Sequence, residues 1–209
     1  SFNRLTAVRE MKANQIEDYF KDIRNQIITF SEDHTVIQAM HEFQAGFDTI
    51  HHEVDYSEFE QVEVENRLTD YYNTEYLPRL NENVEDDGDM DHHYPKHPSS
   101  IVLQDLYISN NPNEVGQKHF LERAKDNSFY SDAHEKYHPL FRSYLEKFEF
   151  YDIFLVDDKT GHIIYSVYKE VDFGTSLIDG PYANSNIAEA FRAANSATDK
   201  DYVKLVDFS

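Results

Sequence analysis

The chain has no cysteine and only six glycines among its 209 residues. Without cysteine it cannot form disulfides, thiolate metal sites or covalently attached c-type haem, and it has no cysteine nucleophile. The few glycines form no phosphate-binding loop, and the Gly-x-Ser-x-Gly elbow of serine hydrolases is missing. No window approaches the roughly 20 apolar residues that a membrane span requires. Because the sequence does not begin with methionine, we expect it to be a piece of a longer protein.

Positive charge is also scarce, because 19 Lys and Arg residues face 40 Asp and Glu residues, for a formal net charge of -21. Such a field repels phosphate groups, so we expect no nucleic-acid partner and no docking to anionic lipid. Hydrophobic residues make up 40% of the chain and include 15 Tyr and 15 Phe, which is enough to form a folded core.

The N-terminal part of the sequence has the apolar spacing of helices. A seam of apolar residues recurs every three or four positions near the start, with the members Ile16, Phe20, Ile23, Ile27 and Phe30. Leu5 and Val8 extend this apolar face upstream. Two interpretations remain open: a core-facing helix of a bundle, or a helix that pairs with its copy in a dimer and transmits a signal. Further helices are expected over residues 35–50, 57–78, 99–109, 117–125, 130–148 and 186–194, with caps at Asp33, at Ser57 with Glu60, and at Asn186.

The stretch from Tyr151 to Tyr168 predicts a β-hairpin, because two β-branched and aromatic runs flank a turn at residues 157–161. Another strand is expected over Tyr202–Phe208. Since three strands make a thin sheet, we expect its remaining strands beyond Ser209. The sequence therefore predicts an α+β protein with a helical, dimerising and signalling region at residues 1–129. A ligand-binding module with an antiparallel sheet, incomplete at the C-terminus, is expected at residues 130–209.

His134-Glu-Lys-Tyr-His138 matches the pattern of zinc proteases, in which two histidines one helical turn apart bind the metal and the glutamate, here Glu135, is the general base. Pro139 fits best as the first residue of a new helix, which would keep the two histidines off a common face. We therefore expect neither metal nor catalysis here, and a zinc hydrolase is kept as an alternative. Whether the acidic loop at residues 82–91 binds a metal ion is left open.

Aromatic and charged residues gather where the last long helix meets the hairpin. The candidate ligand-binding residues are Tyr130, Tyr137, Arg142, Tyr151, Tyr165, Lys169 and Asp172. Apolar walls with a few placed polar groups suit a small polar ligand. The same residues also fit an aromatic core whose charged groups reach the solvent, and both interpretations stay open.

Five segments carry a resemblance to a known family: Gln15–Gln26, Tyr137–Arg142, Tyr151–Asp157, Ile164–Glu170 and Gly180–Ser185. Through them the chain, from about Asn14 to Ser209, resembles the double-Cache, PAS-like ligand-binding regions of bacterial transmembrane receptors. Such regions occur in methyl-accepting chemotaxis proteins and in receptor kinases or nucleotide cyclases. The stretch between Asp33 and Tyr130 is longer than in that family, and the strands that usually bind amino acids would lie past Ser209.

The resemblance implies a PAS-like sheet that binds a small molecule, of the amino acid or carboxylate class, and a first helix that follows a membrane span and dimerises. We therefore expect an extracytoplasmic, periplasmic sensor domain of an inner-membrane receptor, a chemoreceptor foremost, with no enzymatic activity and no cofactor. The alternatives are the sensor of a histidine kinase or nucleotide cyclase, the zinc hydrolase, and a helical adaptor that dimerises without a ligand.

Overall fold

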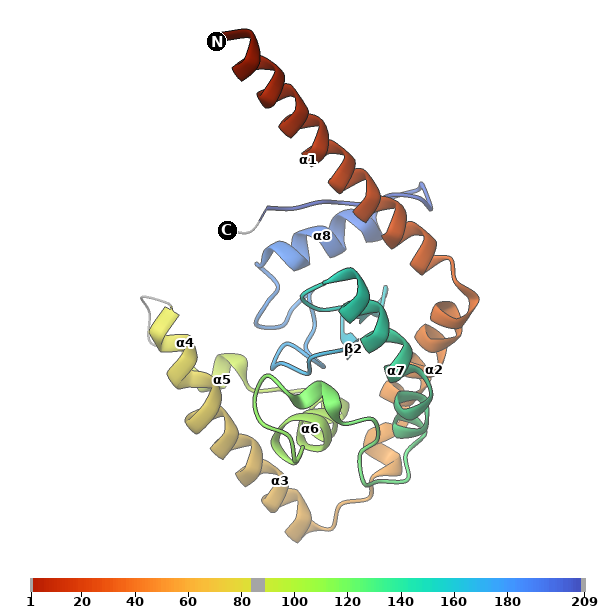
Figure 1. Ribbon diagram of the computed structural model, residues 1–209. Helices are drawn as coiled ribbons and strands as arrows, with labels where there is room; N and C mark the ends of the chain where they lie inside the picture. The colour runs from red at the N-terminus through yellow and green to blue at the C-terminus, as the bar shows by residue number, and fades with distance from the viewer. Residues whose placement is uncertain (1, 84–88, 208–209) are drawn as a thin grey trace.

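The computed structural model describes residues 2–83 and 89–207, and this part of the chain is mostly helical with one small antiparallel sheet (Figure 1). The coarse α+β prediction is confirmed, whereas a PAS-like fold stays a prediction. Residues 84–88 of the predicted acidic loop lie outside the described residues. The elements, in which η marks π and 3₁₀ turns, are α1 (Phe2–Ser31), α2 (His34–Glu53), α3 (Glu58–Tyr71), η1 (Tyr72–Tyr76), α4 (Leu77–Asn83), α5 (Met90–His93), α6 (Pro98–Gln104), η2 (Asp105–Ser109), η3 (Lys118–Phe120), α7 (Phe129–Phe148), β1 (Phe154–Val156), β2 (Ile163–Ser166) and α8 (Asn186–Asn195).

Helix starts follow side-chain caps, most of which the sequence predicts. Asp33 accepts a backbone N–H at the start of α2, and Ser57 and Glu60 form the reciprocal capping box of α3. The last cap differs by one residue, because Ser185 rather than Asn186 accepts the N–H in the first turn of α8.

Two predicted helix boundaries are wrong. The third helix does not end at Pro78 but continues through α4. The proline ring would clash with a carbonyl in the preceding turn of a regular α-helix, and here that turn is the wider π turn η1. The expected helix over residues 117–125 is only the short 3₁₀ turn η3. There the side chains of Asn111 and Lys118 bind each other's backbone carbonyls at 3.0 and 3.1 Å, so side chains satisfy the backbone in place of a helix.

The predicted hairpin is confirmed. Strands β1 and β2 pair antiparallel, with Phe154 opposite Ser166 and Leu155 opposite Tyr165, and a bulge follows Leu155. An isolated bridge from His162 to Ser176 ties the loop after β2 back to the hairpin. The sheet therefore positions the residues that directly follow β2.

The strand expected over 202–208 is absent from its described part, residues 202–207. This segment lies along α8 instead of beside the hairpin (Figure 1), because Lys204 pairs with Glu189 at 3.3 Å and Asn186 donates to the carbonyl of Asp207 at 2.5 Å. The expectation of further strands beyond Ser209 stays a prediction.

The core forms where α2 and α7 pack against each other and against β2. Gly46 of α2 allows this close approach, because a Cβ there would lie 2.8 Å from the Tyr130 Cα. The buried cluster takes residues from both sides of the predicted boundary at 129/130, and that division stays a prediction. Its largest fully buried members are Phe43, Ile50, Leu103, Tyr107, Tyr130, Tyr137, Phe141, Tyr165 and Phe173.

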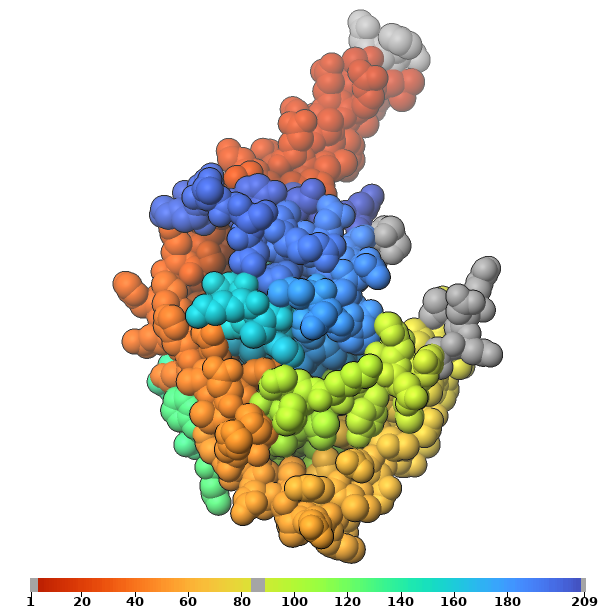
Figure 2. All heavy atoms as spheres, turned by 180° about the vertical axis from the view of Figure 1, so that it is seen from behind, coloured from red at the N-terminus to blue at the C-terminus, as the bar shows by residue number. Residues whose placement is uncertain are grey.

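Helix α1 projects from this body (Figures 1 and 2). Its last turns touch the core through Phe30, whose ring lies 5.4 Å from Phe141 and stacks on Tyr144. Ile16 is 56% exposed and Phe20 47% exposed. Most of the predicted apolar seam is therefore uncovered by the described part of the chain.

Candidate functional site

A pocket of about 420 Å³ opens where the end of β2 faces the α3–η1–α4 helix, and we call it the tyrosine–acid pocket. The segment that follows β2 forms one wall, and the helix forms the other. A turn before η3 closes one end. The lining residues are Tyr71, Glu75, Tyr76, Arg79, Leu80, Asn83, Val115, Gly116, Lys118, Tyr168, Lys169, Glu170, Val171, Asp172 and Tyr182.

Two acids, Asp172 and Glu170, lie on the β2 side of the pocket. Burial raises the pKa of Asp172 to about 7, and Asp152 and Glu170 act in the same direction. The Oδ1 atom of Asp172 is buried and has no hydrogen-bond partner among the described residues. Burial also raises the pKa of Glu170, which accepts a hydrogen bond from the Tyr151 hydroxyl at 3.2 Å. A cation that enters the pocket would relieve both carboxyl groups.

Cations and phenols occupy the opposite side of the pocket. Arg79 pairs with Glu75 at 2.8 Å, and Lys118 is the second cation. The hydroxyls of Tyr76 and Tyr182 lie 3.2 Å apart, and burial raises the pKa of both phenols, so they stay neutral. Asp172 and Glu170 on one wall, Arg79 with its partner Glu75 on the other, and Lys118 at the end of the pocket complement a small molecule that carries both charges.

Lys169 belongs to the same wall, but its side chain turns into the core. Its φ of 61° lies in the left-handed region, and only 2% of the residue is exposed. The Nζ atom lies 4.3 Å from the Tyr165 ring centroid and donates to the carbonyl of Ser166. Burial lowers the pKa of Lys169 to about 7, while Asp152 acts in the opposite direction. The Lys169 side chain therefore packs in the core behind the pocket wall and does not reach into the pocket.

The other candidate residues do not line this pocket. Tyr130 and Tyr165 are fully buried in the core, and Tyr137 is buried with its hydroxyl bound to a carboxylate on α2. Arg142 pairs with an acid in the loop before α7, and Tyr151 is 73% exposed. The structure thus brings together two of the predicted residues in one pocket wall, and the ligand-binding role of all of them stays a prediction.

The two histidines of the zinc-protease pattern do share a helical face, contrary to the prediction. Helix α7 continues through Pro139, which removes only the bond to the carbonyl of the exposed Glu135, where water can replace it. The His134 and His138 rings stack at 4.3 Å.

Three of the four ring nitrogens make internal hydrogen bonds, and His134 Nε2 is buried without a partner among the described residues. His134 Nδ1 donates to the carbonyl of Glu122 at 2.6 Å. His138 Nε2 donates to the carbonyl of His119 and its Nδ1 accepts from the Tyr165 hydroxyl, both at 2.7 Å. Burial lowers the pKa of His134 and His138, which favours their neutral forms. Within residues 2–83 and 89–207, no three His, Asp or Glu side chains are placed to hold a metal ion.

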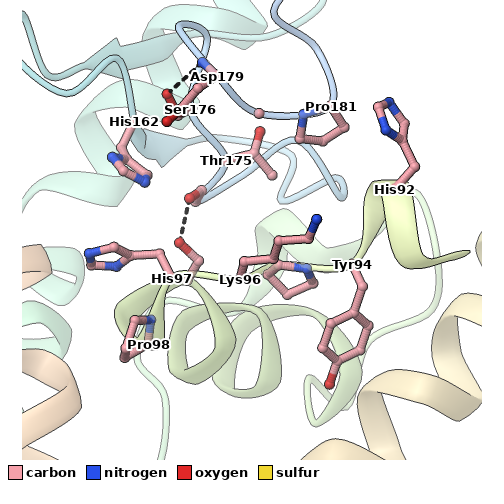
Figure 3. A pocket seen from close by; sticks show the side chains of 14 residues that line it. His92, Tyr94, Lys96, His97, Pro98, His162, Thr175, Ser176, Asp179 and Pro181 are labelled. Carbon is pink, nitrogen blue, oxygen red and sulfur yellow. Dashed lines mark hydrogen bonds between the residues drawn. The ribbon is translucent and has the colours of Figure 1, made fainter.

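A second pocket, also of about 420 Å³, has two walls (Figure 3). One wall is the segment from α5 to the start of α6, and the other is the loop after β2. In Figure 2 these two segments, yellow-green and blue, adjoin on the surface. We call it the histidine cleft, and it shares no lining residue with the tyrosine–acid pocket. Its lining residues are His92, Tyr94, Pro95, Lys96, His97, Pro98, Ser100, His162, Gly174, Thr175, Ser176, Asp179, Gly180 and Pro181.

Sequence reasoning missed the helix side of the tyrosine–acid pocket. Tyr72 and Tyr76 both fit the apolar spacing of the helix predicted over residues 57–78, but of the two Tyr72 is the fully buried one. Tyr76 instead points its hydroxyl at Tyr182, a contact over 106 positions in the sequence. Arg79, three residues after Tyr76, was the available signal, because positions i and i+3 share a helical face.

Comparison with protein-family models, with curated proteins and with solved structures finds no match for this chain. No helix among the described residues combines the length and the apolar character needed to cross a bilayer. What the protein does is therefore argued from the geometry of its pockets.

Proposed function

We propose that this chain is an extracytoplasmic ligand-sensing domain of a bacterial transmembrane signalling receptor, a chemoreceptor foremost, which binds a small molecule in the tyrosine–acid pocket. The observation that carries the proposal is the buried, unpartnered Oδ1 of Asp172 in the wall of a ligand-sized pocket. Leaving a buried polar atom without a partner is unfavourable, and a bound ligand would supply the partner.

The charges of the pocket favour an amino acid or a similar zwitterion as the ligand. The ammonium group would pair with Asp172 and Glu170, and the carboxylate would face Arg79 and Lys118. Each contact would be a charge-assisted hydrogen bond, which is the strongest kind available to a small polar ligand. We propose no catalytic activity.

A continuous set of ring contacts connects the pocket to the first helix. Tyr165 of β2 lies three residues before the pocket wall begins, and its ring is 4.5 Å from Phe43 of α2 and 4.9 Å from Phe141 of α7. Phe141 in turn meets Phe30 of α1 at 5.4 Å. A ligand that shifts the segment after β2 would thereby bias the position of α1.

The signal would then travel along α1, which we propose to dimerise through its apolar seam and to lead to the inner membrane. The output domain that receives this signal could equally be a histidine kinase, a nucleotide cyclase or a chemotaxis signalling domain. A purely helical adaptor would not require a ligand-sized pocket, so this alternative is disfavoured. No observation favours the zinc hydrolase.

The test is isothermal titration calorimetry of the wild-type chain and of Asp172→Asn against a panel of amino acids and organic acids. We expect one zwitterion to bind, and the variant to weaken its Kd by about ten- to a hundredfold, because a charge-assisted contact is lost. Affinity should rise as pH increases through about 7, where Asp172 ionises, and this dependence should vanish in the variant.

Asp158→Asn is the matched control, because it removes the same charge from an exposed position in the hairpin turn. If no member of the panel binds, or if Asp172→Asn and Asp158→Asn behave alike, the pocket is not the sensing site.

A further inference from the structure

The histidine cleft is less acidic than the rest of this chain. Its walls carry one lysine, Lys96, and three histidines, whereas Asp179 is the single acid among its lining residues. Figure 3 shows Lys96 extending into the open space of the cleft, with His97 and His162 on one side of it and His92 on the other. With the histidines neutral, Lys96 and Asp179 balance each other, so in a chain of net charge -21 this concave surface repels an anion less than its surroundings do.

The serine and threonine hydroxyls of the cleft already donate hydrogen bonds to backbone carbonyls. Ser100 donates to the carbonyl of Gly174 at 2.5 Å, and Ser176 donates to the carbonyl of Thr160 at 2.9 Å (the first of these bonds is drawn in Figure 3). Thr175 also donates to a backbone carbonyl, that of Asp172, at 2.7 Å. The Tyr94 hydroxyl also has no hydrogen-bond partner among the described residues, but in Figure 3 it points away from the Lys96 ammonium. The side-chain donors left for a ligand on the Lys96 side are therefore the ammonium of Lys96 and the imidazoles.

Ring packing fixes the positions of the imidazoles of His97 and His162 and leaves hydrogen-bonding capacity for a ligand. The ring of His97 stacks on Phe47 at 5.3 Å, and the ring of His162 lies 5.1 Å from Phe47 and 4.9 Å from His97. His162 Nδ1 is buried and has no hydrogen-bond partner among the described residues. Lys96 forms no ion pair in the same part of the chain. Preorganised donors with free capacity are what a bound anion requires.

We propose that the histidine cleft is a second binding site, separate from the tyrosine–acid pocket, which binds a small oxyanion through Lys96, His97 and His162. The ligand is a carboxylate or a phosphate group, since both present the same oxygen acceptors. A metal ion is the less suitable occupant, because no three ligating side chains converge among residues 2–83 and 89–207.

Anion binding at this site is coupled to proton uptake. Burial lowers the pKa of His162, His97 lowers it further, and the acids that face it, Asp179, Asp157 and Asp48, act in the opposite direction. An oxyanion next to the ring favours the protonated form. Affinity should therefore increase as pH falls through the histidine range, the reverse of what we expect for the tyrosine–acid pocket.

The experiment is calorimetric titration with sulfate, a tetrahedral dianion of constant charge that represents phosphate, and with succinate, at constant ionic strength. We expect saturable binding, tighter at about pH 6 than at about pH 8. Lys96→Gln should weaken it by about tenfold or more, because hydrogen bonds to charged groups are lost. Asp179→Asn should strengthen it, since the single acid among the lining residues is removed. Whichever anion binds more tightly identifies the carboxylate or the phosphate source.

Lys147→Gln is the matched control, because Lys147 is an exposed lysine on α7 that lies outside the cleft. The proposal is overturned if neither anion binds, if Lys96→Gln and Lys147→Gln weaken binding equally, or if zinc binds stoichiometrically in place of the anions and is lost in His97→Gln. Because Asp172→Asn leaves the cleft unaltered, it should bind sulfate and succinate as the wild type does. If no anion binds in the histidine cleft, the proposal for the tyrosine–acid pocket is unaffected, because zwitterion binding there is measured separately.

Discussion

Helices α1 and α2 carry the same kind of apolar stripe, yet one stripe is exposed and the other is buried. Phe20 of α1 is 47% exposed, whereas Phe43 of α2 is fully buried and Phe47 is 4% exposed. Both stripes repeat every three or four residues, which is the signature of an amphipathic helix. Periodicity thus tells that a helix has an apolar face, but what covers that face depends on residues far away in the sequence.

The cover of α2 is an aromatic cluster. The ring of Phe43 lies 4.5 Å from Tyr165, 5.3 Å from Tyr130 and 6.1 Å from Tyr137. Such pairs add to the burial energy of each ring. Along α1, only the end around Phe30 has comparable neighbours. The difference predicts that matched substitutions in the two helices have unequal effects.

The largest effect should come from Phe43→Ala. Removing a buried ring leaves a cavity, so we expect the free energy of unfolding to fall by about 3–5 kcal/mol. Phe20→Ala removes the same atoms from an exposed position and should change it by about 0.5 kcal/mol or less. Denaturant titration in dilute solution measures both values. Equal losses would mean that the Phe20 side of α1 is covered within one chain.

A smaller effect is expected from Gly46→Ala, which adds one heavy atom between α2 and α7. The new Cβ would lie 2.8 Å from the Tyr130 Cα, so the helices must move apart. We expect a loss of about 1–3 kcal/mol, despite the better helix propensity of alanine. Ala13→Ser adds one heavy atom to exposed α1 and should be nearly neutral. A stabilising Gly46→Ala would show that α2 and α7 do not approach this closely.

The accuracy of the sequence-based predictions follows the range of the interactions involved. The capping box at Ser57 and Glu60 and the hairpin around Asp157 are set by neighbouring residues, and both were predicted. Pro139 was misread because its effect on α7 depends on whether the carbonyl of Glu135 is exposed. The strand expected over 202–208 is wrong in its described part, residues 202–207, because that segment has its partners on α8 rather than on a sheet edge.

The candidate site was predicted in part for the same reason. Lys169 and Asp172 follow β2 directly, so their place beside the sheet could be predicted from the hairpin. The side chain of Lys169 nevertheless turns inward, because its left-handed backbone directs it toward Tyr165. The opposing wall, with Tyr76 and Arg79, comes from a helix some 90 residues earlier, and no local pattern links the two.

The third prediction concerns the uncovered stripe of α1 itself, which a second copy of the chain would cover. Phe20→Glu places a charge in the apolar seam and should weaken self-association by about tenfold or more, equivalent to about 1.4 kcal/mol. Asn25→Glu adds the same charge to exposed α1 away from the seam and should leave the dimer intact. Sedimentation equilibrium over a range of concentrations measures both dissociation constants. If the wild type is monomeric throughout, or if Asn25→Glu weakens association as much as Phe20→Glu, α1 does not pair through this seam. In that case the exposed apolar face of α1 would need a partner other than a second copy of the chain, because an apolar stripe of this length is unfavourable in water.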